Sequence, residues 1–366
     1  MKRRVLVVQP YGIGDLLFLT PVLRALRVLP TVEKVDLLLG SRTDAVLRGN
    51  PHVDEIMVVN KDLFHKQGKW KTFSDVRALT AKLADKKYDL LLDYSLRGEY
   101  AFLSQFFLGI RRRAGFDYKH RGFFHSIRMP LAGGFKGRHV VDYVCDLAEK
   151  AGVPVRDRHL EFYMDPKDRE EARARLTRVF EPRARILAIA PGGGESWGKD
   201  AHFKRWPAPF FAQLAEKLHE FQFFDGAIIL GSGGESDLGA AIAEHLKMPV
   251  LDLCGKTSLG VTAAIMGKSA VFLGNDGGLM HLAHALQVPL AALFGPSDPI
   301  VYGPYPSSRE AVVVTQDLEC RPCYQKFRYN SACAKRECLQ ELTPEEAWST
   351  MLAKNFLSQS AGLKTV

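Results

Sequence analysis

The sequence predicts an α/β protein made of two domains, each a doubly wound parallel sheet covered by helices. Its 366 residues exceed what one hydrophobic core usually fills. Short apolar runs with strand character alternate with helix patterns, first over residues 1–150 and again after residue 186. Such alternation is typical of parallel sheets built from βαβ units. The charged segment 165–185, which closes on Glu181-Pro182, separates the two series and predicts a boundary helix and linker.

The predicted elements follow one another in βαβ order. In the first series the strands are Arg4–Val8, Val35–Leu39, Ile56–Val59 and Tyr88–Asp93, and the helices are about Asp15–Val28, Thr72–Asp85 and Val140–Lys150. In the second series the strands are Ile186–Ala190, Ala227–Leu230, Pro249–Leu253, Ala270–Leu273 and Leu290–Phe294, with helices near Pro207–Glu220, Glu235–Leu246 and Leu259–Met266. A last helix is predicted from about Pro344 to Phe356. The predicted domains are therefore 1–180, 181–342 and a C-terminal helix in 343–366.

Composition places the chain among soluble globular proteins, since 46% of its residues are hydrophobic and 25% are charged. No apolar run reaches the roughly 18 residues that a membrane-spanning helix needs. The N-terminal sequence MKRRVLVVQPYG has too short an apolar core for a signal peptide. We therefore expect a cytoplasmic protein.

Charge is divided unevenly along the chain. Residues 1–180 hold 33 Lys and Arg against 22 Asp and Glu, whereas the remainder holds 17 against 19. Clusters such as Arg111, Arg112 and Arg113 suggest that the first half meets an anionic partner or an acidic membrane surface, although solvated faces would look the same. Nucleic acid is disfavoured because no recognisable binding module interleaves aromatic with basic residues.

The segment Ser269–Pro299 combines a strand, a polar turn, a helix, a second strand and a second polar turn. The first turn, Asn275–Gly278, opens a helix, and the second, Gly295–Pro299, ends the next strand. Ligands of open α/β sheets bind at the carboxyl ends of the strands, so both turns are predicted ligand loops. Helix N-termini and glycine-rich backbone favour an anionic ligand such as phosphate. An ordinary βαβ unit remains the structural alternative.

The loop Gly12-Ile13-Gly14-Asp15 follows the first predicted strand. Its two glycines allow a ligand to approach the backbone closely. Asp15 either caps the next helix or presents a carboxylate that takes a proton from a hydroxyl nucleophile. A dinucleotide-binding fingerprint is excluded, because the third glycine of G-x-G-x-x-G would fall at Leu17.

A glycine-rich loop at residues 191–207 follows the first strand of the second domain. Its run of three glycines, Gly192–Gly194, and the Lys204 ammonium favour a pyrophosphate, which would accept hydrogen bonds from backbone N–H groups and be neutralised by the cation. Lys199 and Arg205 are competing cations, and a solvated surface role for Lys204 is the alternative.

A second glycine-rich loop in that domain, residues 231–235, also turns into a helix. Glu235 binds a ribose hydroxyl pair or, equally well, stabilises its own helix as a first-turn acid. The nearby Gly255-Lys256 resembles a P-loop fragment, but the upstream glycine of that motif would fall at Val250. A P-loop is therefore excluded.

Four of the six cysteines, Cys320, Cys323, Cys333 and Cys338, lie close together in the sequence. Their spacing is compatible with tetrahedral zinc in a structural site. Reduced packing thiols and redox pairing remain open as alternatives, the latter disfavoured in a cytosolic protein.

These motifs, in this order, resemble family 9 of the glycosyltransferases, and the resemblance covers nearly the whole chain. The matching residues are Gly14-Asp15 with Thr20–Arg27, Asn50-Pro51 with Asp54-Glu55, Lys204 with Trp206-Pro207, Asp276–His281, and Phe294–Pro299. The resemblance implies a GT-B fold, in which two Rossmann-like domains face across a cleft and the last helix crosses back to the first domain. It also implies an inverting transfer that requires no catalytic metal and no cofactor.

The resemblance also assigns roles. It implies that Asp15 is the base that deprotonates the acceptor hydroxyl and that Lys204 contacts the donor pyrophosphate. Asp276 would contact the donor sugar, the Gly277-Gly278 backbone and His281 would face the diphosphate, and Glu235 would hold the nucleoside ribose. Many relatives have Ser or Thr at the position of Gly277, so the exact donor stays open.

The expected reaction is transfer of a heptose or related sugar from a nucleotide-diphosphate donor, ADP-heptose, to a lipopolysaccharide core or similar acidic glycolipid. The basic first half, including Arg111–Arg113, would bind the acceptor, with peripheral contact at the cytoplasmic face of the inner membrane. Nucleic acid is not an expected partner. Two other functions remain open at this stage: a nucleotide-sugar epimerase of GT-B architecture, and a non-catalytic, zinc-containing nucleic-acid binder.

Overall fold

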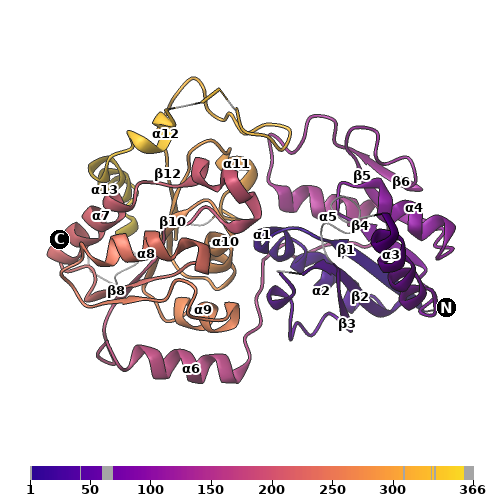
Figure 1. Ribbon diagram of the computed structural model, residues 1–366, viewed down its shortest axis with the longest axis horizontal. Helices are drawn as coiled ribbons and strands as arrows, with labels where there is room; N and C mark the ends of the chain where they lie inside the picture. Colours follow the sequence, from indigo (N-terminus) through magenta and orange to yellow (C-terminus); the bar gives the residue numbers. More distant parts are fainter. Residues whose placement is uncertain are drawn as a thin grey trace. The chain divides into compact units, whose positions relative to one another are not determined.

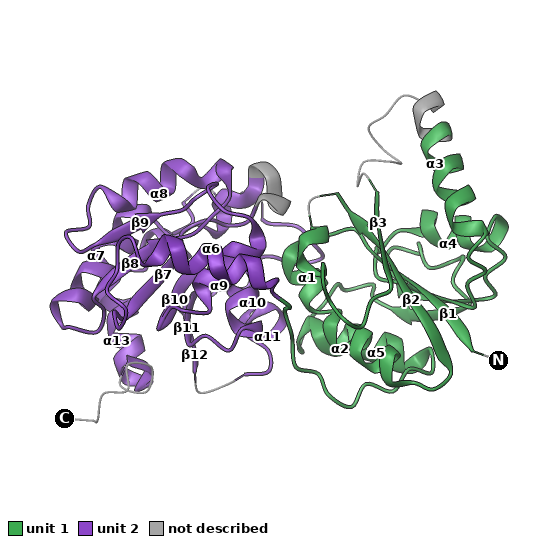
Figure 2. Cartoon of the chain, turned by 90° about the horizontal axis from the view of Figure 1, so that it is seen from below, with its two compact units in different colours: residues 1–163 green, residues 164–366 purple. Residues whose placement is uncertain are grey.

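The computed structural model describes residues 2–41, 43–59, 69–307, 310–330, 332–333 and 335–357. It divides the chain into two compact units, Met1–Tyr163 and Met164–Val366 (Figure 2). The predicted boundary after residue 180 differs from this division because helix α6 (Pro166–Leu176) packs on helix α9 (Leu259–Met266) of the second unit. The two helices approach so closely that a Cβ at Gly260 would lie 2.0 Å from the Asp168 carboxylate.

The first unit contains, in its described part, a six-stranded parallel sheet in the order β3-β2-β1-β4-β5-β6 (Figure 1). Its strands are β1 (Arg3–Gln9), β2 (Val32–Gly40), β3 (Glu55–Val59), β4 (Leu90–Asp93), β5 (Arg112–Asp117) and β6 (Ile127–Pro130). Its helices are α1 (Ile13–Leu17), α2 (Thr20–Val28), α3 (Lys69–Ala84), α4 (Gly98–Phe106) and α5 (Val140–Lys150). This strand order is the doubly wound order of Rossmann-like sheets.

The second unit repeats this topology in its described residues, with the strand order β12-β11-β10-β7-β8-β9 and parallel pairing throughout. Its strands are β7 (Ile186–Ala190), β8 (Gly226–Ile229), β9 (Val250–Asp252), β10 (Val271–Asn275), β11 (Leu290–Leu293) and β12 (Ala311–Val314). Its remaining helices are α7 (Ala208–Glu220), α8 (Ser236–Ala243), α10 (Gly278–Ala285), α11 (Pro299–Tyr302), α12 (Glu337–Gln340) and α13 (Pro344–Ala353). The predicted fold class, two doubly wound α/β units, is confirmed.

The predicted strands formed where apolar runs are buried on both faces. Strands β7, β10 and β11 are buried along their whole length, as central strands of a sheet covered by helices must be. The helix predicted over Asp15–Val28 is instead two helices, α1 and α2, with Pro21 in the first turn of α2. Proline in the first turn of a helix costs no hydrogen bond, so a new helix begins there.

The last helix, α13, belongs to the core of the second unit. Thr343 caps it by accepting the Glu346 N–H, and the Glu346 carboxylate accepts the Thr343 N–H in return. Its residues Trp348 and Met351 are buried in the same core as α7 and β12. Residues 344–357 therefore pack within the second unit, where the sequence predicted a helix that crosses back to the first; residues 358–366 lie outside the described part. Among the described helices, none is both long and apolar enough to cross a bilayer.

Candidate active site

Both sheets reverse their strand order at one strand, and the predicted site residues lie at those two points. In the first unit β1 lies between β2 and β4, and in the second β7 lies between β8 and β10. The helices that follow two such adjacent strands cover opposite faces of the sheet, which leaves a crevice at the carboxyl ends of the strands. Each unit therefore has its own topological site for a ligand.

Asp15 lies at the switch point of the first unit, in the short helix α1 that follows β1. Its Oδ2 accepts the Gly12 N–H at 2.9 Å, which fixes the carboxylate over the start of the helix. The side chain is only half-buried. The hydrogen bond confirms the capping interpretation, and the role of Asp15 as a base remains a prediction.

Tyr11 and Ser95 join the loops after β1 and β4. The Tyr11 hydroxyl donates to the Ser95 carbonyl. Burial raises the pKa of Tyr11 to about 12; the Asp15 and Asp93 carboxylates add to this effect, and the Arg97 guanidinium opposes it. Tyr11 is therefore a neutral donor at physiological pH, beside Asp15.

A buried pair that the sequence did not reveal supports the same edge. The His125 Nε2 lies 3.1 Å from Asp93 Oδ2, and both side chains are almost fully buried. Asp93 Oδ1 also accepts the Ser95 N–H at 2.9 Å. The imidazole fits because residue 115 is glycine: a Cβ there would lie 2.3 Å from the ring. This pair fixes the loop that carries Ser95.

In the second unit, two residues predicted to bind the donor form an ion pair with each other. Lys204 Nζ lies 2.6 Å from Asp276 Oδ2, and the side chains are only 6% and 4% exposed. Lys204 ends the loop after β7, and Asp276 directly follows β10, so the pair spans the switch point of this sheet. The side chain of the competing Lys199 lies outside the described part.

Asn275, which the sequence analysis did not single out, connects the same two loops. Its Oδ1 accepts the Trp206 N–H at 3.1 Å, and its Nδ2 donates to the Pro191 carbonyl at 2.7 Å. The side chain is buried at the end of β10. An amide can make both bonds because it carries a donor and an acceptor, which an aspartate at this position could not do.

Gly277, Gly278 and His281 form the start of α10, as predicted. Gly277 is the N-cap residue in extended conformation, Gly278 is the first helical residue, and His281 is buried one turn later. The first N–H groups of a helix have no carbonyl partner within it and favour an anion. A Cβ at Gly277 would meet no atom closer than 3.8 Å, so packing does not exclude the Ser or Thr of other family members.

Glu235 has a structural role in the glycine-rich loop after β8. Its Oε2 accepts the Ser232 N–H at 2.9 Å and the Ser232 hydroxyl at 3.0 Å, in a capping arrangement. Its Oε1 accepts the Gly194 N–H at 3.3 Å, which ties this loop to the one after β7. Contact with a ribose remains a prediction.

The arginines predicted to bind the acceptor differ in their surroundings. Arg112 donates to the Ala151 carbonyl and Arg113 donates to the Phe124 carbonyl, so both guanidiniums hold the fold of the first unit. Burial lowers the pKa of Arg113. Arg111 is exposed. An acceptor contact therefore remains a prediction, with Arg111 the accessible member of the three.

The four clustered cysteines are free thiols. Cys323, Cys333 and Cys338 line one small cavity together with Tyr329 and Arg336. Within the described residues, however, no three His, Cys, Asp or Glu side chains lie close enough together to hold a metal ion. Burial raises the pKa of Cys338 to about 11, which favours the protonated thiol. The surroundings of Cys323, Cys333 and Cys338 favour packing thiols, whereas Cys320 is exposed, and a structural metal remains a prediction.

Two doubly wound sheets, each with polar loops at its switch point, match the GT-B fold. A family model described as "Glycosyltransferase family 9 (heptosyltransferase)" matches residues 76–333. The chain belongs to this family and is a glycosyltransferase.

Individual relatives agree with this assignment. The chain is 26% identical to lipopolysaccharide heptosyltransferase 1 of Pseudomonas aeruginosa over 344 residues, 88% of this chain and 86% of that protein. The solved E. coli ADP-heptose lipopolysaccharide heptosyltransferase II superposes with a TM-score of 0.74 at 21% identity over 98% of this chain and 99% of that one. An E. coli heptosyltransferase solved with ADP gives 0.69 at 20% identity over 96% and 99%. These two superpositions show a common fold.

The fold alone does not separate a transferase from the epimerase alternative. A solved UDP-N-acetylglucosamine 2-epimerase superposes with a TM-score of 0.50 at 12% identity over 99% of this chain and 91% of that one. The family match extends over both units and identifies the chain as a transferase.

Proposed function

We propose that this protein transfers a heptose from ADP-heptose to a lipopolysaccharide core or similar acidic glycolipid, with inversion at the anomeric carbon. Support comes from the names of the curated relatives, which are lipopolysaccharide and lipooligosaccharide heptosyltransferases. The ADP of a solved relative supports the choice of nucleotide. The acceptor oxygen attacks the anomeric carbon, the bond to the diphosphate breaks, and the acceptor proton passes to a base.

The observation that carries this proposal is the position of Asp15. Its carboxylate lies at the carboxyl edge of β1, accepts the Gly12 N–H through Oδ2, and is partly exposed to solvent. A base held in one orientation removes the proton from the attacking hydroxyl without first paying for reorientation. Tyr11, kept protonated by its raised pKa, offers a neutral neighbour that does not neutralise the carboxylate.

The second unit supplies what the departing diphosphate needs. The N–H groups at the start of α10 point out of the helix at Gly278, where developing negative charge is stabilised. The Lys204 ammonium lies beside them, already paired with Asp276. In this proposal Lys204 contacts the pyrophosphate while it retains Asp276 as its second partner, and Asp276 contacts the donor sugar.

Substitution of Asp15 by asparagine tests the base. The amide of the Asp15→Asn variant retains an oxygen for the Gly12 N–H but takes up no proton, so turnover falls by about 10²–10⁴-fold while ADP binding is unchanged. Asp44→Asn is the matched control, because Asp44 is also a partly exposed aspartate of the first unit and pairs with Arg48. Turnover of Asp15→Asn within tenfold of the wild type would contradict the role of Asp15.

Donor and reaction type are tested separately. A nucleotide sugar at ~100 times its dissociation constant adds roughly 2.7 kcal/mol of apparent stability, so thermal-shift screening ranks ADP-heptose against other activated sugars. Incubation of a nucleotide sugar without any acceptor distinguishes the epimerase, which would change the sugar under these conditions. We expect stabilisation by ADP-heptose and no change of the sugar until acceptor is added.

A further inference from the structure

The surface of the first unit carries a cluster of phenylalanines that its fold does not use. The members, here called the phenylalanine cluster, are Phe102, Phe106, Phe107, Phe123 and Phe124. Phe106 is 57% exposed and Phe123 is 74% exposed. Helix α4 buries its other face through Tyr100, Ala101 and Ser104, so it is apolar on two sides. Large apolar groups gathered on the surface of a protein mark an interaction site.

The rings form one continuous surface although they come from two segments. Phe102 contacts Phe106 at 4.9 Å and Phe124 at 5.1 Å between ring centroids, and Phe123 contacts Phe124 at 5.3 Å. Arg113 joins the segments, because its guanidinium donates both to the Gln105 side chain of α4 and to the Phe124 carbonyl. The cluster is therefore held in place by the fold.

Basic residues outnumber acidic ones in the part of the sequence that contains the cluster. Residues 98–138 contain eight Lys and Arg and two acidic residues, Glu99 and Asp117. The Asp117 carboxylate accepts the Gly122 N–H at 3.0 Å and so is engaged within the same loop. Lys119 and Arg121, two to four residues before Phe123, are exposed. Exposed aromatic rings bordered by cations suit the interface of an anionic bilayer, where apolar groups enter the headgroup region and cations meet lipid phosphates.

The same charge argues against a second copy of this chain as the occupant. Two identical surfaces of this kind would bring like charges together around the rings, which opposes association. An anionic lipid surface has the complementary charge.

The two segments that carry the cluster start from the edge of the sheet that carries Asp15. Helix α4 begins after β4, and the loop with Phe123 begins after β5, both at the carboxyl edge. The two meet there, since a Cβ at Gly98 would lie 3.0 Å from the Arg121 carbonyl. The phenylalanines lie farther along these two segments, since Phe106 ends α4 and Phe124 is bound by Arg113 near the start of β5.

We propose that the phenylalanine cluster and the adjoining Lys119 and Arg121 dock this protein on an anionic lipid bilayer. The proposal deepens the proposed function, and rests on it in one respect: a glycolipid acceptor is itself held in such a bilayer. The sequence analysis predicted contact with an acidic membrane from net charge alone. The proposal names the side chains that make this contact.

Co-sedimentation of the full chain with vesicles tests the surface. The vesicles contain phosphatidylcholine alone or with about a third phosphatidylglycerol, and binding should require the anionic lipid and weaken with salt. We expect Phe106→Ser/Phe107→Ser to weaken binding at least tenfold, and Lys119→Ser/Arg121→Ser to weaken it roughly 5-fold for each cation removed. Phe221→Ser is the matched control: Phe221 is 59% exposed in the second unit, packs on Trp348, and its loss should leave binding unchanged.

Three outcomes would overturn the proposal: no binding of the wild type to anionic vesicles, wild-type binding by the Phe106/Phe107 variant, or a loss of dimers in that variant with vesicle binding intact. The last outcome would identify a contact between copies. ADP binding by thermal shift and transfer to a deacylated, soluble acceptor are measured on the same samples. If transfer fails while vesicle binding depends on the cluster, the proposed function falls and the surface stands; the reverse pattern rejects the surface alone.

Discussion

Loss of the Lys204 ammonium should destabilise the second unit far more than loss of an exposed lysine. The pair of Lys204 and Asp276 has an N–O distance of 2.6 Å and side chains 6% and 4% exposed. Lys204→Met keeps the apolar stem and removes the charge, which leaves the Asp276 carboxylate buried without its counterion. Removing one partner of a buried pair costs about 3–5 kcal/mol. We expect a loss of that size in the free energy of unfolding of the second unit.

The double variant separates this cost from other effects of the methionine. Asp276→Asn alone leaves a buried ammonium and should cost about as much as Lys204→Met. Lys204→Met/Asp276→Asn removes both charges, so the two losses should not add, and the coupling energy should reach at least about 2 kcal/mol. Urea unfolding followed by tryptophan fluorescence measures this, since three of the four tryptophans, among them the buried Trp206, belong to the second unit.

A matched pair in the same unit provides the control. Lys256 Nζ lies 2.7 Å from Asp252 Oδ2, nearly the same distance, but the Lys256 side chain is 55% exposed. Lys256→Met should therefore cost less than about 1 kcal/mol. If Lys204→Met cost no more than Lys256→Met, or if the double variant showed simple additivity, the buried pair would not exist in solution as the structure has it.

Two further predictions concern the donor unit and the thiols. Gly192→Ala should lower stability by about 1–3 kcal/mol and weaken ADP binding, because its Cβ would lie 1.8 Å from Glu235 Oε1. Gly277→Ala is the control: its Cβ would meet no atom closer than 3.8 Å, so its melting temperature should equal that of the wild type. Equal melting temperatures for the two variants would disprove the clash at Gly192. In an iodoacetamide time course at pH 8 read by mass spectrometry, the exposed Cys320 should react first and Cys145 and Cys254 last, since burial raises the pKa of both of these thiols to about 12. Protection of Cys320 that a chelator removes would instead reveal a metal on the clustered cysteines.

The sequence predicted strands correctly where burial of apolar residues dominated the local pattern. Strand β10 and its neighbour β11 are apolar runs buried on both faces, and their order in the chain fixes a parallel sheet. Strand β5 escaped prediction because it begins with Arg112-Arg113, which looked like a solvated anion-binding cluster. Its arginines are tolerated because they donate to carbonyls of segments that only the folded chain brings near.

The sequence named residues of the candidate site but did not predict which of them contact one another. Asp15, Lys204 and Asp276 all follow strands at the switch points, and that placement follows from topology. The pairing of Lys204 with Asp276, 72 positions away, does not follow from the order of strands. The same holds for His125, which reaches Asp93 only because Gly115 has no side chain.

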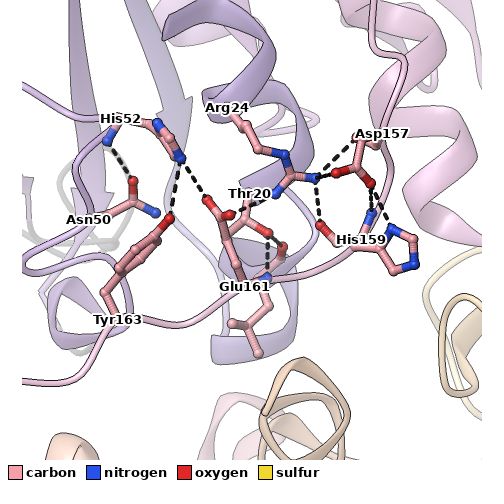
Figure 3. A network of polar contacts seen from close by, with 9 residues as sticks. Thr20, Arg24, Asn50, His52, Asp157, His159, Glu161 and Tyr163 are labelled. Atoms are coloured by element: carbon pink, nitrogen blue, oxygen red, sulfur yellow. Dashed lines mark hydrogen bonds and ion pairs between the residues drawn. The ribbon is translucent and has the colours of Figure 1, made fainter. Parts of the chain in front are cut away.

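Some family motifs of the first unit have no predicted role in the chemistry. Their residues hold the segment that leads to the second unit (Figure 3). Arg24, from the Thr20–Arg27 motif, donates to Glu161 Oε2 at 2.6 Å and to the His159 carbonyl at 3.0 Å. The Thr20 hydroxyl accepts the Glu161 N–H at 3.1 Å. These bonds hold the chain on the first unit almost up to Tyr163, its last residue.

The second motif closes the same network. Asn50 Oδ1 accepts the His52 N–H at 2.8 Å, and the His52 ring lies 3.2 Å from Glu161 Oε1 and 3.3 Å from the Tyr163 hydroxyl. Burial, helped by the Arg24 and Arg27 guanidiniums and opposed by Glu161, lowers the pKa of His52. At neutral pH His52 is therefore an uncharged hydrogen-bonding group, and the ionic contact is made by Arg24. Both motifs thus fix the point at which the chain leaves the first unit, which explains how residues without a part in the chemistry can mark the family.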